Sequence, residues 1–327
     1  MTRALLVACA VFSSACGLID AVAGAPSDPG RGGEGEGDDE GEGEGEGEVD
    51  LEGDGDGCDP AALPLEARAV AVGFDRSCAL LCDGAVRCWG AQSEAPAGGP
   101  FGAIAVSSYW ACARTAAGDV RCAGQTSSLS APELDGAPVP MQAIGAGQNF
   151  LCGIDDADSI ECWGTLDWPS FDIPSGAFGS LSVGWGYVCG HRLASGELVC
   201  GGTSFRPVPP DDVALTQVGV GSDFGCGLDG AGAIHCFSDE ALVDLEVPAG
   251  AHTALGVGDG TACAVRAADA ALVCFGNSVS DTEDITGAVP PGRFRSVAVA
   301  SKHACAIRED HAVVCFGDDT WGRTSVP

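Results

Sequence analysis

The chain has 327 residues, a formal net charge of −32 at pH 7, 50 glycines and 18 cysteines. So strong a negative charge repels phosphate backbones, which argues against nucleic acid as a partner. Eighteen cysteines are too many for a reduced cytoplasm unless they bind metal, so the composition indicates either an exported protein or a zinc protein.

Residues 1–16 predict an export signal. Arg3 supplies a positive charge, and residues 4–15 form an apolar stretch of 12, too short for a transmembrane helix, which needs about 20. The last four residues, SSAC, resemble the lipobox of bacterial lipoproteins. The resemblance implies that Cys16 is lipidated and that the protein reaches the outer membrane, cell surface or periplasm of a Gram-negative cell. The alternative is an ordinary cleaved secretion signal in which Cys16 has no role.

Residues 17–57 form an acidic segment rich in glycine. Between residues 26 and 57 there are 14 acidic residues, 12 glycines and one arginine, Arg31. Such a composition cannot bury apolar surface, so we expect a disordered tether that is extended by its own charge. Residues 26–57 carry a net charge of −13 and residues 1–25 carry none, which leaves −19 for residues 58–327.

Residues 58–327 consist of seven copies of one unit. Each copy has an alternating apolar stretch, a small residue five positions before a cysteine, and a second cysteine 10 or 11 positions after the first. Turn residues such as Asp83-Gly84 separate the two cysteines, and the apolar period is two rather than 3.6. Each pair therefore predicts a β-hairpin. The pairs are Cys78 with Cys88, Cys112 with Cys122, Cys152 with Cys162, Cys189 with Cys200, Cys226 with Cys236, Cys263 with Cys274 and Cys305 with Cys315.

A proline-bearing stretch follows each of the first six hairpins and suits an outer edge strand, because proline cannot donate to a ladder. Three or four short antiparallel strands per unit, repeated seven times around an axis, predict an all-β fold, a seven-bladed β-propeller. The seventh unit ends at residue 327, at the position where each earlier unit leads into the next one. Residues 63–65 precede the first unit. We therefore expect strands from the two ends to meet in one blade.

The cysteine spacing favours disulfides over zinc. Cysteines opposite each other in a hairpin can reach the required Cβ separation of about 4 Å. Zinc prefers C-x₂₋₄-C clusters, and only Cys78 and Cys82 are that close in sequence. Cys58 and Cys82 remain in the first unit, and we expect them to pair; the alternative is that Cys82 is free or bonded elsewhere. We expect no metal and no cofactor.

The repeat also resembles a known family. Cys88-Trp89-Gly90 and the same triplet at residues 162–164 keep a C-W-G motif, and residues 302–305 (KHAC) keep a histidine two positions before the cysteine. Together with residues 318–327 (DDTWGRTSVP), these motifs resemble the repeat of the regulator of chromosome condensation, in its cysteine-bearing bacterial form, over about residues 63–327. The resemblance implies a seven-bladed propeller but no single function.

No motif for a catalytic nucleophile, a phosphate loop or a metal centre occurs, and the five histidines lie in four different units. Residues 318–321 (DDTW) resemble the Asp-box of sialidases but lack its frame. We therefore expect a protein that is not an enzyme. The alternative is a propeller hydrolase or lyase with a carboxylate site at the central mouth.

The loop between the small residue and the first cysteine of each pair is the best candidate for a binding surface. Equivalent loops of a propeller lie on one face, and aromatic residues flanked by Asp and Asn are typical of protein-binding hot spots. For Trp110, Phe150, Tyr187 and Phe224, two positions before the cysteine, the alternative is packing between blades. The predicted binding residues are Phe74, Asp75, Tyr109, Trp110, Asn149, Phe150, Trp185, Tyr187, Asp223, Phe224 and Lys302.

These features together predict an exported, lipid-anchored, monomeric propeller that binds another protein or a surface glycan without catalysis. Contact with the membrane is expected through the lipid anchor only. The sequence leaves two alternatives, the propeller enzyme and a passive surface spacer.

Overall fold

The computed structural model describes residues 58–59, 65–124, 134–166, 171–203, 207–210, 213–222, 224–238, 245–276 and 285–327. The predicted export signal, Cys16 and the acidic tether lie outside these ranges. In the part of the chain that is described, no helix is long and apolar enough to cross a bilayer.

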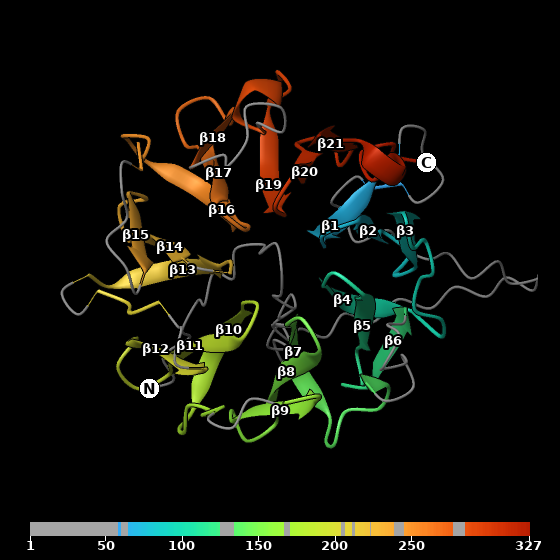
Figure 1. The fold of residues 1–327 in the computed structure, drawn as a ribbon, viewed down its shortest axis with the longest axis vertical. Helices are drawn as coiled ribbons and strands as arrows, with labels where there is room; N and C mark the ends of the chain where they lie inside the picture. Colours follow the sequence, from blue (N-terminus) through green and yellow to red (C-terminus); the bar gives the residue numbers. More distant parts are fainter. Residues whose placement is uncertain are drawn as a thin grey trace, which may run out of the picture.

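The described residues form seven antiparallel sheets of three consecutive strands, arranged in a ring around a central axis (Figure 1). We number them blades 1 to 7 in chain order, so the predicted seven-bladed propeller is confirmed, with three strands per blade. The strands are β1 (Ala67–Val72), β2 (Arg76–Leu81), β3 (Val86–Gly90), β4 (Phe101–Val106), β5 (Trp110–Thr115), β6 (Val120–Gly124), β7 (Met141–Ala146), β8 (Phe150–Asp155), β9 (Ile160–Gly164), β10 (Phe178–Val183), β11 (Tyr187–Arg192), β12 (Leu198–Gly202), β13 (Leu215–Val220), β14 (Phe224–Asp229), β15 (Ile234–Ser238), β16 (His252–Val257), β17 (Thr261–Arg266), β18 (Leu272–Gly276), β19 (Phe294–Val299), β20 (His303–Arg308) and β21 (Val313–Gly317).

Each blade buries both faces of its inner strands against its neighbours, which explains why these strands are almost wholly apolar. In one cluster, Cys78 and Leu80 of blade 1 pack against Ile104 and Val106 of blade 2. In blade 1, the hairpin between the second and third strands turns on Gly84, which has a φ of +80° that strains other residues and which donates its N–H to the carbonyl of Leu81 at 3.0 Å.

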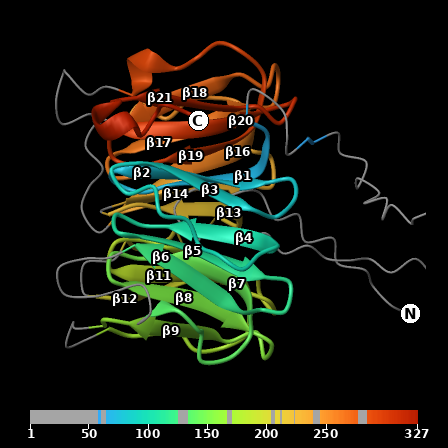
Figure 2. The same cartoon turned by 90° about the vertical axis from the view of Figure 1, so that its right-hand side faces the viewer.

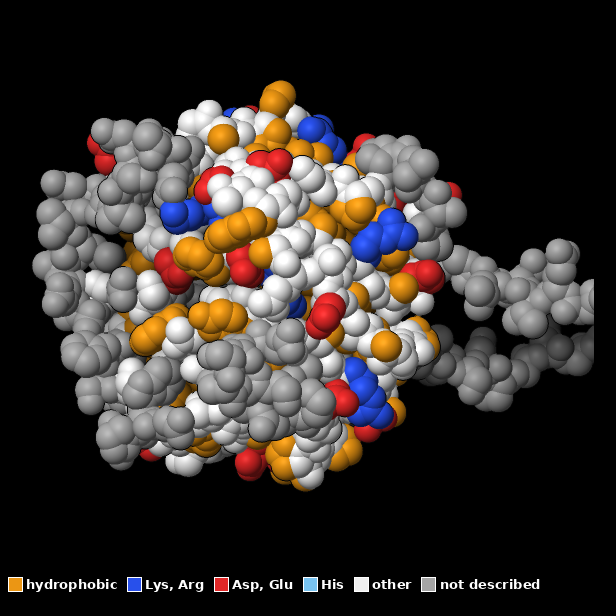
Figure 3. Space-filling view, turned by 45° about the vertical axis from the view of Figure 1, so that its right-hand side comes forward, with side chains coloured by type: hydrophobic (Ala, Val, Ile, Leu, Met, Phe, Trp, Pro, Cys, Tyr) orange, Lys and Arg blue, Asp and Glu red, His pale blue; other side chains and the backbone are white. Residues whose placement is uncertain are grey.

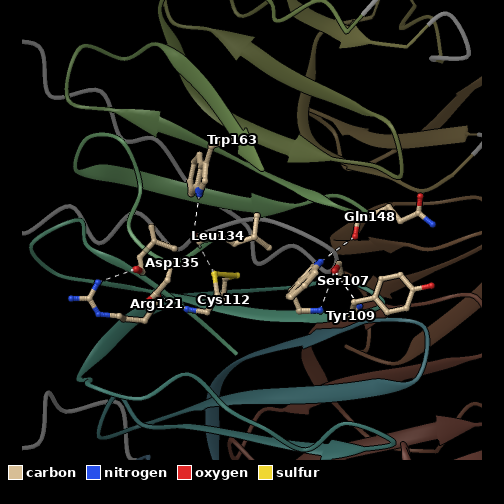
Figure 4. The surroundings of a disulfide bond; sticks show 11 residues. Ser107, Tyr109, Cys112, Arg121, Leu134, Asp135, Gln148 and Trp163 are labelled. Atoms are coloured by element: carbon tan, nitrogen blue, oxygen red, sulfur yellow. Dashed lines mark hydrogen bonds between the residues drawn. A yellow bond between two sulfur atoms is a disulfide. The ribbon is translucent and has the colours of Figure 1, made fainter. Parts of the chain in front are cut away.

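The proline-bearing stretches do not form a fourth strand where the structure describes them. They connect the outer strand of one blade to the inner strand of the next, and they join the two blades by hydrogen bonds (Figure 4). The carbonyl of Leu134 accepts the indole N–H of Trp163 in blade 3 at 3.0 Å, and the Asp135 carboxylate accepts the amide of Cys122 in blade 2 at 2.9 Å.

The two ends of the propeller meet, but not inside one blade. All seven sheets are built from strands that are consecutive in sequence, so the prediction of a shared blade is wrong. Instead, the amide of Ala67 donates to the carbonyl of His311 at 3.0 Å, and the amide of Val313 donates to Leu65 at 2.9 Å. The bond from Ala67 repeats the one found at other blade junctions, such as Phe101 to Gly84 at 2.8 Å. The junction also contains an isolated antiparallel bridge between Glu66 and Ala312, so the two ends pair over a few residues outside the seven sheets.

The C-terminal segment completes this last junction. After β21 it forms a 3-10 turn, η2 (Thr320–Gly322), followed by Arg323, whose side chain is only 1% exposed. The backbone carbonyl of Arg323 accepts the indole N–H of Trp89 at 2.9 Å and the hydroxyl of Ser77 at 2.8 Å, both in blade 1. Arg323 thus takes the place that Leu134 takes against Trp163.

All eight predicted disulfides are confirmed, including Cys58–Cys82. The seven hairpin bridges join directly opposed positions of the second and third strands, with Cα atoms 4.0–4.1 Å apart. Cys58–Cys82 differs, because it joins the chain before β1 to the turn after β2. Glu66 lies close to these two sulfur atoms, but the disulfide occupies both of them. So many disulfides are typical of extracellular or exported proteins.

Candidate binding face

The seven loops between the first and second strands surround one end of the central axis. Their small residues line a cavity of about 70 Å³, which we call the mouth. A Cβ atom on Gly221 would collide with the carbonyl oxygen of Gly258 in the next blade, and one on Gly184 would lie 2.6 Å from that of Gly221. Neighbouring loops therefore touch at the mouth, which explains why the sequence keeps a small residue there. These residues are Gly73, Ser107, Gly147, Gly184, Gly221, Gly258 and Ala300.

The end of the propeller that carries these loops and the C-terminal turn 318–323 is called the mouth face below. The opposite end carries the hairpin turns, such as residues 82–85, and is called the turn face. Cys58 lies at the turn face because it is bonded to Cys82. Figure 2 shows the short blue segment of residues 58–59 at one end of the axis and the red C-terminal turn at the other.

Three aromatic side chains are exposed among the described residues, and all three lie on the mouth face. Phe74 is 43% exposed, Trp185 is 50% exposed and Trp321 is 59% exposed. Phe74 in blade 1 and Trp185 in blade 4 both line the mouth, on well-separated parts of the ring. Trp321 lies farther out, with its ring centroid 5.8 Å from the guanidinium carbon of Arg323. The other exposed large hydrophobic side chains of the described residues, such as Val139 and Leu193, are aliphatic.

Four of the predicted contact residues need correction. Trp110, Phe150, Tyr187 and Phe224 are buried between blades, in agreement with the alternative from the sequence, because each begins the second strand of its blade and packs against a neighbour. The indole of Trp110 donates to the carbonyl of Gln148 at 3.3 Å, and the Tyr187 hydroxyl donates to Gly221 at 2.9 Å. These side chains support the loops of the next blade and do not face a partner.

The other predicted residues have mixed positions. Phe74 and Trp185 are exposed, whereas Asp75, Tyr109, Asn149 and Lys302 are half-buried on the mouth face. Figure 4 shows Ser107, Tyr109 and Gln148 lying close together at this end of blades 2 and 3. Asp223 lies outside the described residues.

In the other blades, the position two residues before the first cysteine holds a polar residue: Arg76 in blade 1, Thr261 in blade 6 and His303 in blade 7. Arg76 is fully buried, donates to the Gln92 side chain, and burial lowers its pKa; burial also raises the pKa of neighbouring Asp75. His303 is fully buried as well, and burial, together with the nearby Arg323 charge, lowers its pKa to about 3. Both residues therefore have structural roles under the mouth face.

The mouth carries little charge. Asp259 is the only charged residue among the described residues that line it. Farther out stand Asp318 and Asp319, whose pKa values are lowered by hydrogen bonds from Thr320 and Thr324. No pair of carboxylates converges in the described lining. Figure 3 shows acidic, basic and apolar groups intermixed over one side of the molecule.

The sequence reading missed Trp321 and Arg323 as parts of this face. The guanidinium of Arg323 donates to the carbonyls of Asp318 and Phe74, each at 2.8 Å, and forms an ion pair with the Asp318 carboxylate. The contact with Phe74 joins residues 249 positions apart, which no local pattern reveals. The sequence signal for them was the stretch 318–327, which resembles the corresponding stretch of the repeat.

Comparisons with known proteins agree with this architecture. A family model for the regulator of chromosome condensation (RCC1) repeat matches residues 67–94. The chain is similar to the CRINKLY WD40 ectodomain of the Arabidopsis thaliana receptor kinase ACR4, with a TM-score of 0.66 and 20% identity over 78% of this chain and 96% of that one. It is similar to the ectodomain of the Physcomitrella patens receptor kinase CR4, with a TM-score of 0.64 and 20% identity over 76% and 72%.

A third similar structure is Prp20p from Saccharomyces cerevisiae, with a TM-score of 0.52 and 12% identity over 70% of this chain and 74% of that one. These identities are low, so the structures share the fold alone. The family match falls on blade 1, and the same unit recurs around the ring. The chain is therefore a seven-bladed β-propeller built from repeats of the type found in the regulator of chromosome condensation.

Proposed function

We propose that this protein is an exported, non-catalytic binding module whose mouth face receives a partner protein or a surface glycan. One observation carries the proposal: the three exposed aromatic side chains of the described residues, Phe74, Trp185 and Trp321, all lie on that face. Exposed aromatic groups on a rigid support are typical of interaction hot spots, because ordering them on binding costs little entropy.

Features of the similar proteins support this proposal. Two of the similar structures are ectodomains of receptor kinases, and Prp20p binds Gsp1p and histones. A propeller of this type is thus suited to presenting a face to a macromolecule. The cavity of about 70 Å³ is too small for a drug-sized ligand, which takes about 300–1,000 Å³.

The location of the protein is part of the same proposal. Eight disulfides suit an oxidising compartment, and the first 16 residues suit export with lipidation at Cys16, at the surface of a Gram-negative cell. The chain reaches the propeller at the turn face, through Cys58. A tether that starts at Cys16 therefore leaves the mouth face free to point away from the membrane.

Photo-cross-linking tests the proposal. The full chain carries p-benzoylphenylalanine either at Ser108, which lines the mouth, or at Ala117, an exposed residue of a hairpin turn. On intact cells that produce the protein, we expect cross-linked products from position 108 and few from position 117. The products at 108 should fall at least fivefold when Phe74→Ala and Trp185→Ala are combined.

The matched control combines Val139→Ala and Leu193→Ala, which remove exposed aliphatic side chains elsewhere. This control should leave the cross-linking at position 108 unchanged. Equal yields of cross-linked product from positions 108 and 117, or a yield at position 108 that is the same in the aromatic variants, would favour a passive spacer and reject the binding module.

A further inference from the structure

Three side chains that line the mouth favour a positively charged ligand. Phe74 and Trp185 present exposed rings, and Asp259 in blade 6 lies two blades from each of them around the ring. Ring faces are electron-rich, so they attract cations and repel anions. A carboxylate in the same cavity acts in the same direction.

The remaining lining of the mouth is neutral, and four of its side chains can accept hydrogen bonds. Ser107, Ser108 and Ser301 contribute hydroxyl groups, and Gln148 contributes an amide. The rest of the lining consists of five glycines, four valines at the ends of the inner strands, and two alanines. The hydroxyl and amide groups can accept N–H donors from an ammonium or guanidinium group without repelling it.

The basic groups of the mouth face stand outside the cavity. Arg76 and Arg323 are buried beneath the loops, and Arg323 is paired with Asp318. Lys302 is half-buried beside Ser301 and does not line the cavity. The residues that line the mouth therefore include a negative group and no positive one among those the structure describes.

We propose that the mouth binds a lysine or arginine side chain that a partner protein presents on a protruding loop. The cavity of about 70 Å³ has room for the end of one side chain. Phe74, Trp185 and Asp259 surround the cationic group, while Trp321 and the outer loops contact the partner around it. This inference rests on the proposed binding function and adds the chemical class of the partner.

A displayed loop library tests this chemistry. Random eight-residue loops, embedded in a stable scaffold and displayed on phage, are selected on the full chain, which is immobilised through an N-terminal tag at the turn-face side. We expect the selected loops to share a lysine or arginine. Replacing it by norleucine or citrulline in the synthetic loop should weaken binding at least tenfold.

Pairs of variants with the same change in net charge distinguish an effect of the mouth from an effect of the negative charge of the whole chain. Asp259→Asn should weaken binding about tenfold, whereas Asp156→Asn, at an exposed hairpin turn, should change it less than twofold. Lys302→Gln should strengthen binding by removing a repelling charge beside the mouth. Arg87→Gln, an exposed residue of β3, makes the same change in net charge and should have little effect. Asp259 and Asp156 are both exposed, so these variants should fold normally, which circular dichroism verifies.

The results distinguish this inference from the proposed function. If the selected loops lose binding to Trp185→Ala but bind Asp259→Asn normally and tolerate the neutral replacements, the cationic partner is refuted and the binding face is retained. Loops that ignore both Trp185→Ala and Phe74→Ala overturn both proposals. Binding of the full chain to a glycan array that depends on Trp185, with no loop selected, overturns the protein partner in favour of a glycan.

Discussion

The imidazole Nε2 of His303 lies 2.9 Å from the hydroxyl oxygen of Ser77, although the two residues are 226 positions apart. The Ser77 hydroxyl donates its own proton to the carbonyl of Arg323 at 2.8 Å. Nε2 of His303 is therefore the donor, and because the pKa of His303 is lowered to about 3, the ring is neutral at pH 7. Blade 7, blade 1 and the C-terminal segment are thereby joined through one hydroxyl group.

This relationship predicts a dependence of stability on pH. Burial and the Arg323 charge lower the pKa of His303 to about 3, against 6.5 in the unfolded chain. As the pH falls, His303 is therefore protonated in the unfolded chain before it is protonated in the folded protein. Its contribution to the free energy of unfolding is complete above pH 6.5 and declines toward pH 3. At pH 5, the protonation of His303 in the unfolded chain lowers the free energy of unfolding by about 2 kcal/mol relative to pH 7.

The variant His303→Phe should remove this part of the pH dependence, since phenylalanine fills the same position in blades 3 and 5. Urea unfolding at pH 7 and pH 5, without reductant, measures the difference. Burial also lowers the pKa values of His191 and His252, so some dependence will remain. An unchanged difference between the two pH values would contradict the neutral His303.

Replacing Arg323 should loosen blade 1 more than any other blade. In Arg323→Met the carbonyls of Phe74 and Asp318 lose their donor and the Asp318 carboxylate loses its partner. We expect a loss of about 3 kcal/mol in the free energy of unfolding. Hydrogen exchange should accelerate in the loop 73–75 and leave blade 4 unchanged. Arg87→Met, at an exposed position, is the control, and equal effects of the two variants would refute the role of Arg323.

The contact between neighbouring loops predicts that Gly221→Ala is destabilising. Its Cβ would meet the carbonyl of Gly258, and the adjacent blade must shift, at a cost of about 1–3 kcal/mol. Gly230→Ala is the matched control, because nothing lies within 4 Å of a Cβ there. Thermal unfolding of both variants checks the prediction. Equal midpoints would show that the mouth is looser than the structure indicates.

Removing the Cys58–Cys82 disulfide should affect the junction of the two ends. In the double variant Cys58→Ser, Cys82→Ser, residues 65–67 lose the covalent loop that holds them near blade 7. We expect faster hydrogen exchange at the amides of Ala67 and Val313, which bond to His311 and Leu65. The double variant Cys226→Ser, Cys236→Ser should instead accelerate exchange in β14 and β15. The opposite pattern would contradict this prediction.

The repeat spacing made the fold and the disulfides predictable. Cysteines 10 or 11 positions apart, with a turn between them, can occupy opposed positions of a hairpin, and the structure pairs them in that way. Seven such units with the same spacing of features are most simply arranged as a closed ring of blades. No contact between distant residues was needed for either conclusion.

The candidate site was less predictable because it depends on the direction of side chains. Trp110 and Tyr109 are neighbours in sequence, yet the first is buried under the next blade and the second is half-buried at the surface. Only the start of β5 decides between them. Trp321 and Arg323 join the mouth face through contacts with blade 1, which appear only after the chain has closed its ring.

The position of Cys58–Cys82 also determines how the propeller carries a mechanical load. A pull on the chain before Cys58 passes through the disulfide directly to Cys82, so the load bypasses the backbone between Cys58 and β1, which lies inside a covalent loop. The hydrogen bonds of residues 65–67 with blade 7, which close the ring, are inside that loop. Force from the N-terminal side therefore reaches blade 1 beyond its central strand, and the seam between the ends is shielded from peeling.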